Sequence, residues 1–373
     1  MEFRDLKKQY EVLKPEIDAA IACVMESSHF ISGSQVKEIE QQLAEYVGVK
    51  HCITCANGTD ALTLAMKAWD IGKGDAVFVP DFTFFSSAEI VALEGATPIF
   101  VDVLPDTYNM DPSALEEAVQ RVLKEGKCEP KVIIAVDLFG LPADFKKIKA
   151  IARKYNLLLL EDGAQGFGGS IDEQKSCSFG DIATTSFFPA KPLGCYGDGG
   201  AVFTDHDEWA DLIRSYAVHG KGADKYDNIR IGMNSRLDTL QAAVLQVKLK
   251  AFSEYELGAV NQAAKWYNEM LTDSVKKPII ADGFYSSWAQ YTIQVKDEAQ
   301  RDLIQAKLRE KDIPSMVYYR KGMHAEGAFS NIAYHGECPV TEGLCKTVLS
   351  LPMHPYMNKS DVAVICDVIS QYV

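Results

Sequence analysis

The sequence lacks any hydrophobic run long enough to cross a membrane, and it has no internal repeat or low-complexity tract. Its N-terminal residues alternate in charge without an apolar segment, so we expect no signal peptide and no membrane association. Positive charge is in short supply, because 38 Lys and Arg face 52 Asp and Glu and leave a net charge of −14. This negative excess repels polyanions and disfavours nucleic acid as a partner.

A disulfide framework is missing as well. Nine cysteines, an odd number scattered over 373 residues, indicate reduced thiols and therefore a cytoplasmic protein. Cys52 and Cys55 have CxxC spacing, but they lie in an apolar run with no second pair of ligands nearby. We interpret them as buried strand residues and expect no metal site.

What the sequence does contain is an alternation of short apolar runs with amphipathic stretches of helical length. The apolar runs lie at 76–79, 98–101, 132–136 and 157–160, and the amphipathic stretches lie at 61–69, 86–93, 112–123 and 145–155. Continuous apolar runs suit strands that are buried on both faces. The alternation predicts an α/β domain with a mostly parallel central sheet flanked by helices.

The pattern changes after about residue 237, where a helical periodicity runs from 240 towards 270. The remainder mixes an expected strand at 290–295, a helix at 299–310, a strand at 315–319 and a terminal helix at 361–372. We therefore predict two domains. Residues 1–240 form the large α/β domain with an N-terminal arm, and residues 241–373 form a smaller α+β domain entered by a long linking helix.

Lys191 is the most informative residue of the chain. It lies in a turn rich in proline and glycine after an apolar strand, and the hydroxyl of Ser186 lies five residues upstream. A lysine placed in this way can form a Schiff base with a phosphorylated aldehyde. The segment therefore indicates pyridoxal 5'-phosphate as the cofactor.

A phosphate site is suggested by Gly58 and Thr59, which begin an expected helix after Asn57. Free backbone N–H groups at a helix start bind phosphate, although any helix N-cap shows the same pattern. Together with Ser186 these residues form a plausible two-sided phosphate cup.

Asp162 ends the leucine run of an expected strand, and strand ends of a parallel sheet face the ligand crevice. In the company of Lys191 it would pair with the pyridinium nitrogen and keep the ring an electron sink; its alternative role is to cap the next helix. Phe84, in an aromatic cluster at 82–85, would stack on the ring or belong to the core.

The ordered set of motifs resembles the DegT/StrS family of sugar aminotransferases. The motifs are Ile31-Ser-Gly33, Asn57-Gly-Thr-Asp-Ala61, Thr83-Phe84, Glu161-Asp-x-Ala-Gln165, Ser186-Phe-x-x-x-Lys191, Gly197-Asp-Gly-Gly200 and Gly232-Met-Asn-Ser-Arg-Leu-Asp238. The resemblance implies the fold type I architecture of pyridoxal phosphate enzymes, similar to aspartate aminotransferase. It also implies a homodimer with active sites shared between the subunits.

The resemblance assigns roles to individual residues. Lys191 would be the Schiff-base lysine and proton shuttle, with Asp162 on the pyridine nitrogen and Phe84 stacked on the ring. Gln165 would lie beside the hydroxyl of the cofactor. The phosphate positions would be Gly58, Thr59 and Ser186, together with Asn234 from the partner subunit.

Lys191 also separates two activities within the family. Relatives that dehydrate sugars have histidine in place of this lysine, so the resemblance favours an aminotransferase that moves an amino group from L-glutamate to a ketone carbon of a nucleotide-linked sugar. The segments at 187–200 and 234–243 look most like enzymes that act on UDP-3-oxo-N-acetylglucosaminuronate in surface polysaccharide biosynthesis.

Three residues are candidates for substrate contact. Arg236 would grip the sugar carboxylate with two hydrogen bonds or, equally, tie the dimer interface together. Tyr319 and His324 belong to a loop in which both prolines of the related pattern are replaced, one of them by Arg320, so its substrate contacts are open.

Other functions stay open at this point. A carbon-4 aminotransferase acting on a UDP- or dTDP-4-keto-6-deoxyhexose, or an amino-acid lyase, would share Lys191 and Asp162 and differ in the substrate pocket. A non-catalytic sensor or structural homologue would be expected to lose one of these two residues, and both are present.

Overall fold

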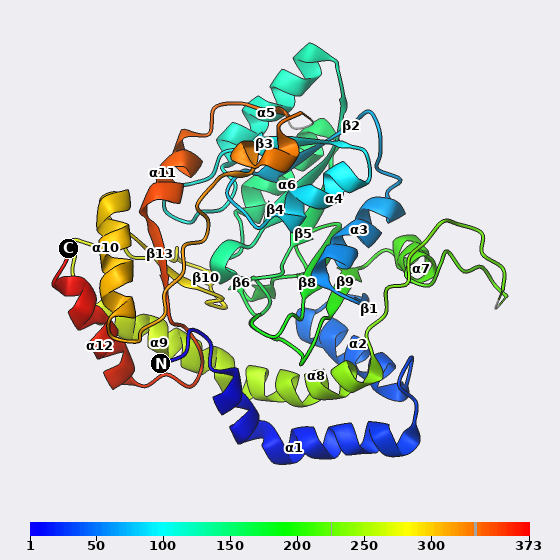
Figure 1. Cartoon of the computed structure of the whole chain (residues 1–373). Helices are drawn as coiled ribbons and strands as arrows, with labels where there is room; N and C mark the ends of the chain where they lie inside the picture. Colours follow the sequence, from blue (N-terminus) through cyan, green and yellow to red (C-terminus); the bar gives the residue numbers. More distant parts are fainter. Residues whose placement is uncertain (225, 332–333) are drawn as a thin grey trace.

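A central sheet of eight strands organises the computed structural model, which describes residues 1–224, 226–331 and 334–373 (Figure 1). Its strands, in spatial order, are β1 (His51–Cys55), β9 (Gly200–Thr204), β8 (Ile182–Ser186), β5 (Leu158–Asp162), β4 (Glu129–Val136), β2 (Asp75–Pro80), β3 (Thr97–Val101) and β12 (Tyr334–His335). All adjacent pairs are parallel except the two that involve β9. The predicted α/β class with a mostly parallel sheet is confirmed.

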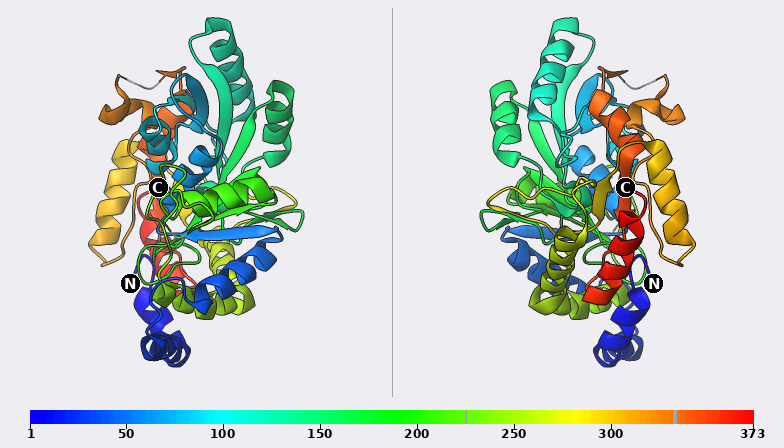
Figure 2. Two further views of the ribbon diagram at one scale, coloured as in Figure 1. Left: turned by 90° about the vertical axis from the view of Figure 1, so that its right-hand side faces the viewer. Right: turned by 90° about the vertical axis from the view of Figure 1, so that its left-hand side faces the viewer.

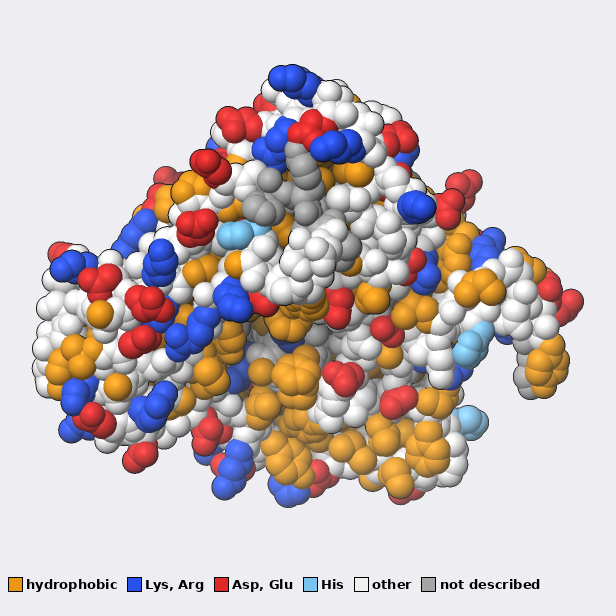
Figure 3. All heavy atoms as spheres, turned by 45° about the horizontal axis from the view of Figure 1, so that its top comes forward, with side chains coloured by type: hydrophobic (Ala, Val, Ile, Leu, Met, Phe, Trp, Pro, Cys, Tyr) orange, Lys and Arg blue, Asp and Glu red, His pale blue; other side chains and the backbone are white. Residues whose placement is uncertain are grey.

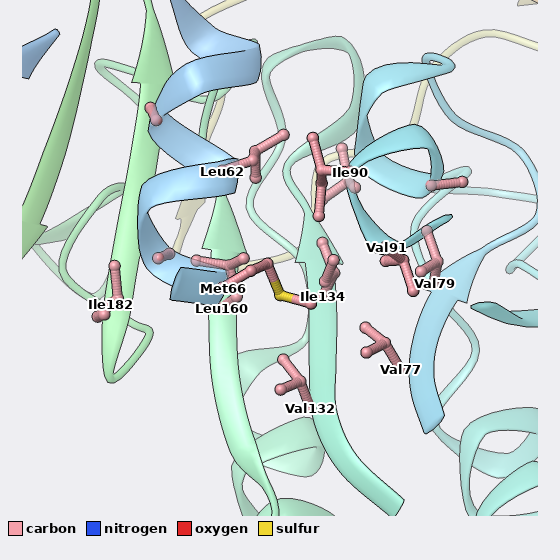
Figure 4. Packing of buried hydrophobic residues seen from close by; sticks show 14 of the residues in the cluster. Leu62, Met66, Val77, Val79, Ile90, Val91, Val132, Ile134, Leu160 and Ile182 are labelled. Carbon is pink, nitrogen blue, oxygen red and sulfur yellow. The ribbon is translucent and has the colours of Figure 1, made fainter. Parts of the chain in front are cut away.

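Helices cover both faces of this sheet because successive strand residues point to opposite sides. Val77 and Val79 pack with helices α3 (Gly58–Ala68), α4 (Ser86–Leu93) and α7 (Asp207–Tyr216), and Figure 4 shows α3 and α4 side chains over the strands. Ala76 and Phe78 pack instead with α5 (Pro112–Glu125) and α6 (Phe145–Tyr155). The strands are therefore buried on both faces, as their continuous apolar sequences predict.

A second hydrophobic core lies in the C-terminal part of the chain. Its side chains come from α9 (Leu257–Met270), β11 (Tyr291–Gln294), α10 (Glu298–Arg309), β13 (Val348–Leu351) and α12 (Lys359–Ser370). The two views of Figure 2 show α10 (gold) and α12 (red) next to each other on one side of the molecule. A two-stranded antiparallel sheet of β11 and β13 lies within this core.

The linking helix is continuous from α8 (Thr239–Ala251) through a π-helical turn at Phe252–Glu256 into α9. Helix α8 packs against α1 (Leu6–Ser27) and α2 (Ser34–Val47), whereas α9 packs against α12. The domain division at residues 240 and 241 stays a prediction. The remaining elements are β6 (Ser170–Ile171), β7 (Gln174–Lys175), β10 (Phe284–Tyr285), α11 (Pro339–Thr347) and short 3-10 turns at Leu138–Gly140, Met323–Ala325 and Gly327–Phe329.

The strand expected at 315–319 is wrong. Only Met316 pairs with a neighbour, through backbone hydrogen bonds of 3.1 and 2.8 Å with Ser350. The next residues leave the sheet because Val317 to Lys321 form part of a cavity wall. An apolar run with aromatic residues has the composition of a strand whether it faces a core or a pocket, so periodicity did not separate the two.

Two smaller expectations concern the cysteines with CxxC spacing and membrane-spanning segments. Cys52 and Cys55 lie in β1 with 2% and 0% of their surfaces exposed, as expected for strand residues. Among the described helices, none is both long and apolar enough to span a membrane.

Candidate active site

A cavity of about 1020 Å³ opens at the carboxyl ends of β2, β5 and β8. Its walls include most of the residues that the sequence analysis selected, namely Gly58, Thr59, Phe84, Asp162, Gln165, Ser186, Lys191 and Tyr319. Figure 3 shows the molecule hollowed near the middle of one face, where hydrophobic and charged side chains meet. The carboxyl ends of parallel strands lie at the same edge of the sheet, so the polar residues that end each strand meet here. Ligands of α/β proteins bind at this edge.

Lys191 follows β8 in a tight turn, in which its backbone N–H donates to the carbonyl of Phe188 at 2.8 Å. Burial lowers the pKa of the Lys191 amine below its ordinary value; the charge of Asp162 raises it and that of Arg4 lowers it further. Burial disfavours the charged form of an amine. The turn thus presents a lysine that loses its proton more easily than a lysine in water.

Asp162 is the last residue of β5, and 5% of its surface is exposed. One carboxylate oxygen accepts a hydrogen bond from the Ser87 hydroxyl at 2.7 Å, and the other accepts from the Ala164 N–H at 3.2 Å. These two donors hold the carboxylate in one orientation at the cavity wall. An oriented carboxylate in a site of low dielectric stabilises a protonated nitrogen placed against it.

The two sides of the phosphate cup approach each other closely. A Cβ atom at Gly58 would lie 2.8 Å from the Cβ of Ser186, so this contact requires glycine at residue 58. Asn57 caps α3 by accepting the Asp60 N–H at 2.8 Å, which leaves the earlier amides of the first turn without an intrahelical partner. Gly58, Thr59 and Ser186 line the same cavity, and N–H groups at a helix start together with a hydroxyl suit the binding of an anion.

The side walls of the cavity carry aromatic and amide groups. Phe84 has 54% of its surface exposed although it lies in the cavity wall, so its ring is available for stacking. Gln165 accepts the Phe139 N–H at 2.8 Å and donates to the Tyr319 hydroxyl at 3.3 Å. The Gln165 side chain therefore links Tyr319 to the backbone at Phe139.

Several cavity residues were not identified from the sequence. Ser87 follows the aromatic cluster at the start of α4, and its position two strands away from Asp162 hid the hydrogen bond between them. Phe188, with 52% of its surface exposed, adds a second accessible ring. Arg320 and Lys321 also line the cavity, and their place in the altered loop was the available signal.

Asn234 and Arg236 do not line this cavity. They lie on a segment between α7 and α8 that projects from the body of the molecule (Figure 1). Between them, the buried Ser235 accepts the Ala56 N–H at 3.0 Å and anchors the base of the segment near the phosphate cup. Asn234 is exposed and Arg236 is half-buried.

His324 also lies outside this cavity, in a second pocket beside Cys338. Its backbone N–H donates to Asp81 at 2.8 Å, and its Nδ1 atom lies 2.6 Å from the other oxygen of that carboxylate. These three residues place potential metal ligands within 4.8 Å of one another. Burial raises the pKa of both the Asp81 carboxyl and the Cys338 thiol, while the hydrogen bonds from His324 lower that of Asp81.

The site fits pyridoxal 5'-phosphate on four counts. It has an amine with a lowered pKa at Lys191, an anchored carboxylate at Asp162, an accessible ring at Phe84 and an anion cup at the start of α3. Combined with a parallel sheet whose strand ends carry these groups, this set defines a fold type I pyridoxal phosphate-dependent transferase.

Comparison with known proteins narrows this class. The chain belongs to the DegT/DnrJ/EryC1/StrS aminotransferase family, whose pattern it matches over residues 11–370. It is similar to UDP-2-acetamido-2-deoxy-3-oxo-D-glucuronate aminotransferase of Pseudomonas aeruginosa, with 44% identity over 98% of each chain. It is also similar to UDP-N-acetyl-3-dehydro-alpha-D-glucosamine 3-aminotransferase of Acidithiobacillus ferrooxidans, with 39% identity over 98% of this chain and 96% of the relative.

A solved structure agrees with the sequence comparisons. The crystal structure of a DegT DnrJ EryC1 StrS aminotransferase from Brucella abortus superposes with a TM-score of 0.97. The two sequences are 49% identical, and the match covers 100% of this chain and 99% of the Brucella chain. The protein is therefore a pyridoxal 5'-phosphate-dependent aminotransferase of nucleotide-linked sugars. The expected fold type I class, cofactor and enzyme class are confirmed.

Proposed function

We propose that the protein transfers the amino group of L-glutamate to the 3-keto carbon of UDP-2-acetamido-2-deoxy-3-oxo-D-glucuronate, in the cytoplasm. The observation that carries this proposal is the convergence of Lys191 and the anchored Asp162 on one large cavity, in a chain that is 44% identical to an enzyme of that name. Lys321 and Arg320 lie in the cavity wall and could contact a substrate with a carboxylate and a diphosphate, although Arg320 also donates to Gln305 at 3.2 Å.

Each residue has a defined task in this reaction. Bound pyridoxal 5'-phosphate supplies the aldehyde and the electron-withdrawing ring. Lys191 Nζ takes a proton from the substrate carbon in one half-reaction and returns one to the sugar carbon in the other, and its lowered pKa favours the neutral, basic form of the amine. Asp162 would keep the pyridine nitrogen of the cofactor protonated, and Gly58, Thr59 and Ser186 would hold its phosphate.

The sugar carboxylate is assigned to Arg236, on the projecting segment of the partner subunit. A guanidinium can hold a carboxylate with two parallel hydrogen bonds, which a lysine cannot reproduce. Arg236→Lys should therefore raise KM for the uronate several-fold more than Lys321→Arg does. Equal effects of the two exchanges would move the assignment to the loop at 318–324.

The direct test uses purified protein loaded with cofactor. L-Glutamate alone should convert the visible absorbance of the bound aldehyde form to that of the amine form. Addition of the UDP-3-keto uronate should restore it and yield a 3-amino sugar, identified by mass spectrometry and by NMR of the aminated carbon. Turnover of a 4-keto-6-deoxyhexose with no turnover of the uronate would replace this proposal by a carbon-4 aminotransferase.

A homodimer with shared sites is the second part of the proposal. The projecting segment exposes hydrophobic side chains, with 91% of Ile231 and 57% of Ile229 accessible, and such a segment needs a protein surface to cover it. Figure 3 shows hydrophobic side chains along this projection. Asn234 lies on the same segment and would reach the phosphate of the partner subunit.

Mixing two inactive variants tests this arrangement. If Lys191 and Asn234 of different subunits complete one site, Lys191→Ala and Asn234→Ala chains should together form mixed dimers with one intact site. Random exchange should then restore about a quarter of the wild-type activity. If Asn234 serves its own subunit, mixing restores none. Light scattering of the unmixed variants controls for the loss of the dimer itself.

A further inference from the structure

The first residues of the chain lie against the turn that carries Lys191. Arg4 donates a hydrogen bond from Nη2 to the carbonyl of Pro192 at 3.0 Å, although 188 positions separate the two residues. The Phe3 carbonyl accepts the Met353 N–H at 3.1 Å, and the Phe3 ring meets Tyr318 edge-on at 6.4 Å. We call Phe3 and Arg4 the N-terminal strap, because these contacts tie it to two walls of the active site.

Three charged groups, the half-buried Arg4 and the buried Glu256 and Lys248, influence one another's pKa values near this turn. Burial lowers the pKa of Arg4 to about 10, against the opposing effect of Glu256. Glu256 is 3% exposed and accepts hydrogen bonds from Gln9 at 2.9 Å and from Tyr356 at 2.5 Å. Lys248 is 1% exposed, and burial lowers its pKa to about 8. The charge of Glu256 raises the pKa of both Arg4 and Lys248 and so partly offsets the effect of burial on these two cations.

The surroundings of Lys191 have opposite effects on the protonation of its amine. Burial favours the neutral form of the Lys191 amine, the charge of Asp162 favours the protonated form, and the charge of Arg4 adds a smaller effect that again favours the neutral form. Only a neutral amine has the lone pair that attacks an aldehyde, and a neighbouring cation is an established way to keep a lysine neutral. Of the described groups around these residues, Cys195 lies close to Lys248, and Tyr356 and His354 lie close to Arg4.

We propose that Arg4 is a positioning residue for Lys191, which holds the Lys191 turn through the Pro192 carbonyl and places a positive charge behind the amine so that it stays reactive. In the step that depends on it, Lys191 Nζ bonds to the aldehyde carbon of the cofactor. The aldehyde oxygen leaves as water with the two amine hydrogens, and no other reactant is needed. The proposal does not depend on which nucleotide sugar is used.

The test measures cofactor capture by full-length protein from which the cofactor has been removed. The rate of condensation with pyridoxal 5'-phosphate is followed by visible absorbance from pH 6 to 10 for wild type, Arg4→Met and Arg4→Lys. Loss of the Arg4 charge removes an effect that lowers the pKa of Lys191, and the effect of one charge on a nearby group inside a protein is on the order of one pKa unit. We therefore expect the midpoint of the Arg4→Met profile to rise by about one pH unit, with capture about tenfold slower at pH 7.

Two comparisons separate the charge from a general effect on folding. Arg4→Lys keeps the charge and should keep the wild-type midpoint, even if the plateau rate falls. Lys7→Met removes an exposed cation from the same end of the chain and should leave the profile unchanged. Glu256→Gln removes the balancing carboxylate and should move the midpoint in the opposite direction, to lower pH.

The result that overturns the proposal is a superimposable pH profile for Arg4→Met and wild type, in protein whose melting temperature shows that it is folded. Equal upward shifts for Arg4→Met and Arg4→Lys would also overturn it, because the charge would then be irrelevant. If Arg4→Met does not fold, the direction of the shift in Glu256→Gln decides. A failure of sugar transamination with normal cofactor capture would count against the proposed function and leave this proposal intact.

Discussion

His354 provides a quantitative prediction about stability and pH. This residue lies between β13 and α12, where 5% of its surface is exposed, and its Nδ1 atom has no hydrogen-bond partner among the described residues. Burial lowers its pKa from the ordinary 6.5 to about 4, with a smaller opposing effect of Asp5. The folded protein therefore keeps His354 neutral in a range where the unfolded chain binds a proton.

The sign of the effect follows from this difference. Well above pH 6.5 both states are neutral at this residue and the stability does not depend on it. As the pH falls towards about 4, the unfolded state gains a proton that the folded state does not, so stability is lost. The full difference corresponds to about 3 kcal/mol, of which about 2 kcal/mol is lost by pH 5.

The measurement is the free energy of unfolding in urea at pH 7.5 and at pH 5, for wild type, His354→Gln and His29→Gln. His354→Gln should lose about 2 kcal/mol less than wild type between the two pH values, whatever its stability at pH 7.5. His29 is exposed and serves as the matched control. Equal pH dependence in wild type and His354→Gln would refute the reasoning.

Three further changes test the active site. Asp162→Asn keeps the shape but removes the charge opposite the cofactor nitrogen, so turnover should fall by about 10²-fold or more while cofactor binding persists; unchanged turnover would contradict the assigned role. Ser87→Ala removes the 2.7 Å hydrogen bond to Asp162 and should lower turnover less than Asp162→Asn does, as steady-state kinetics would show. Gly58→Ala would force a Cβ to within 2.8 Å of Ser186, and a cofactor titration should show affinity weakened about tenfold, with equal affinity as the contrary result.

Two buried carboxyl groups change the stability with pH in the direction opposite to His354. The buried Asp137 and Glu161 carboxyls have pKa values raised chiefly by burial, although Glu161 accepts N–H groups from Cys177 and Phe179. A raised carboxyl pKa stabilises the folded state at low pH and is lost as the pH rises, which is the reverse of the His354 effect. This opposition is why the variant comparison, and not the wild-type curve alone, isolates His354.

Much of the fold could be predicted because it depends on local patterns. Continuous apolar runs marked β2 to β5, and amphipathic stretches marked α3 to α6, since each element must present the right face to one core. The end of each strand then indicated which polar residues reach the crevice. Asp162 was selected on this basis and Lys191 because of its turn rich in proline and glycine, and both line the cavity. Their catalytic roles stay predictions.

What the sequence by itself determined was therefore the order of strands and helices and the chemistry of the residues at the strand ends. Only the tertiary structure decided which distant residues meet them. It brought Arg4 into hydrogen-bond contact with the turn of Lys191, and Ser87 with Asp162. It also brought His324 into contact with Asp81, outside the cavity. The physical reason is that such contacts join positions far apart in the chain and leave no periodicity, because they form only when separate elements pack together.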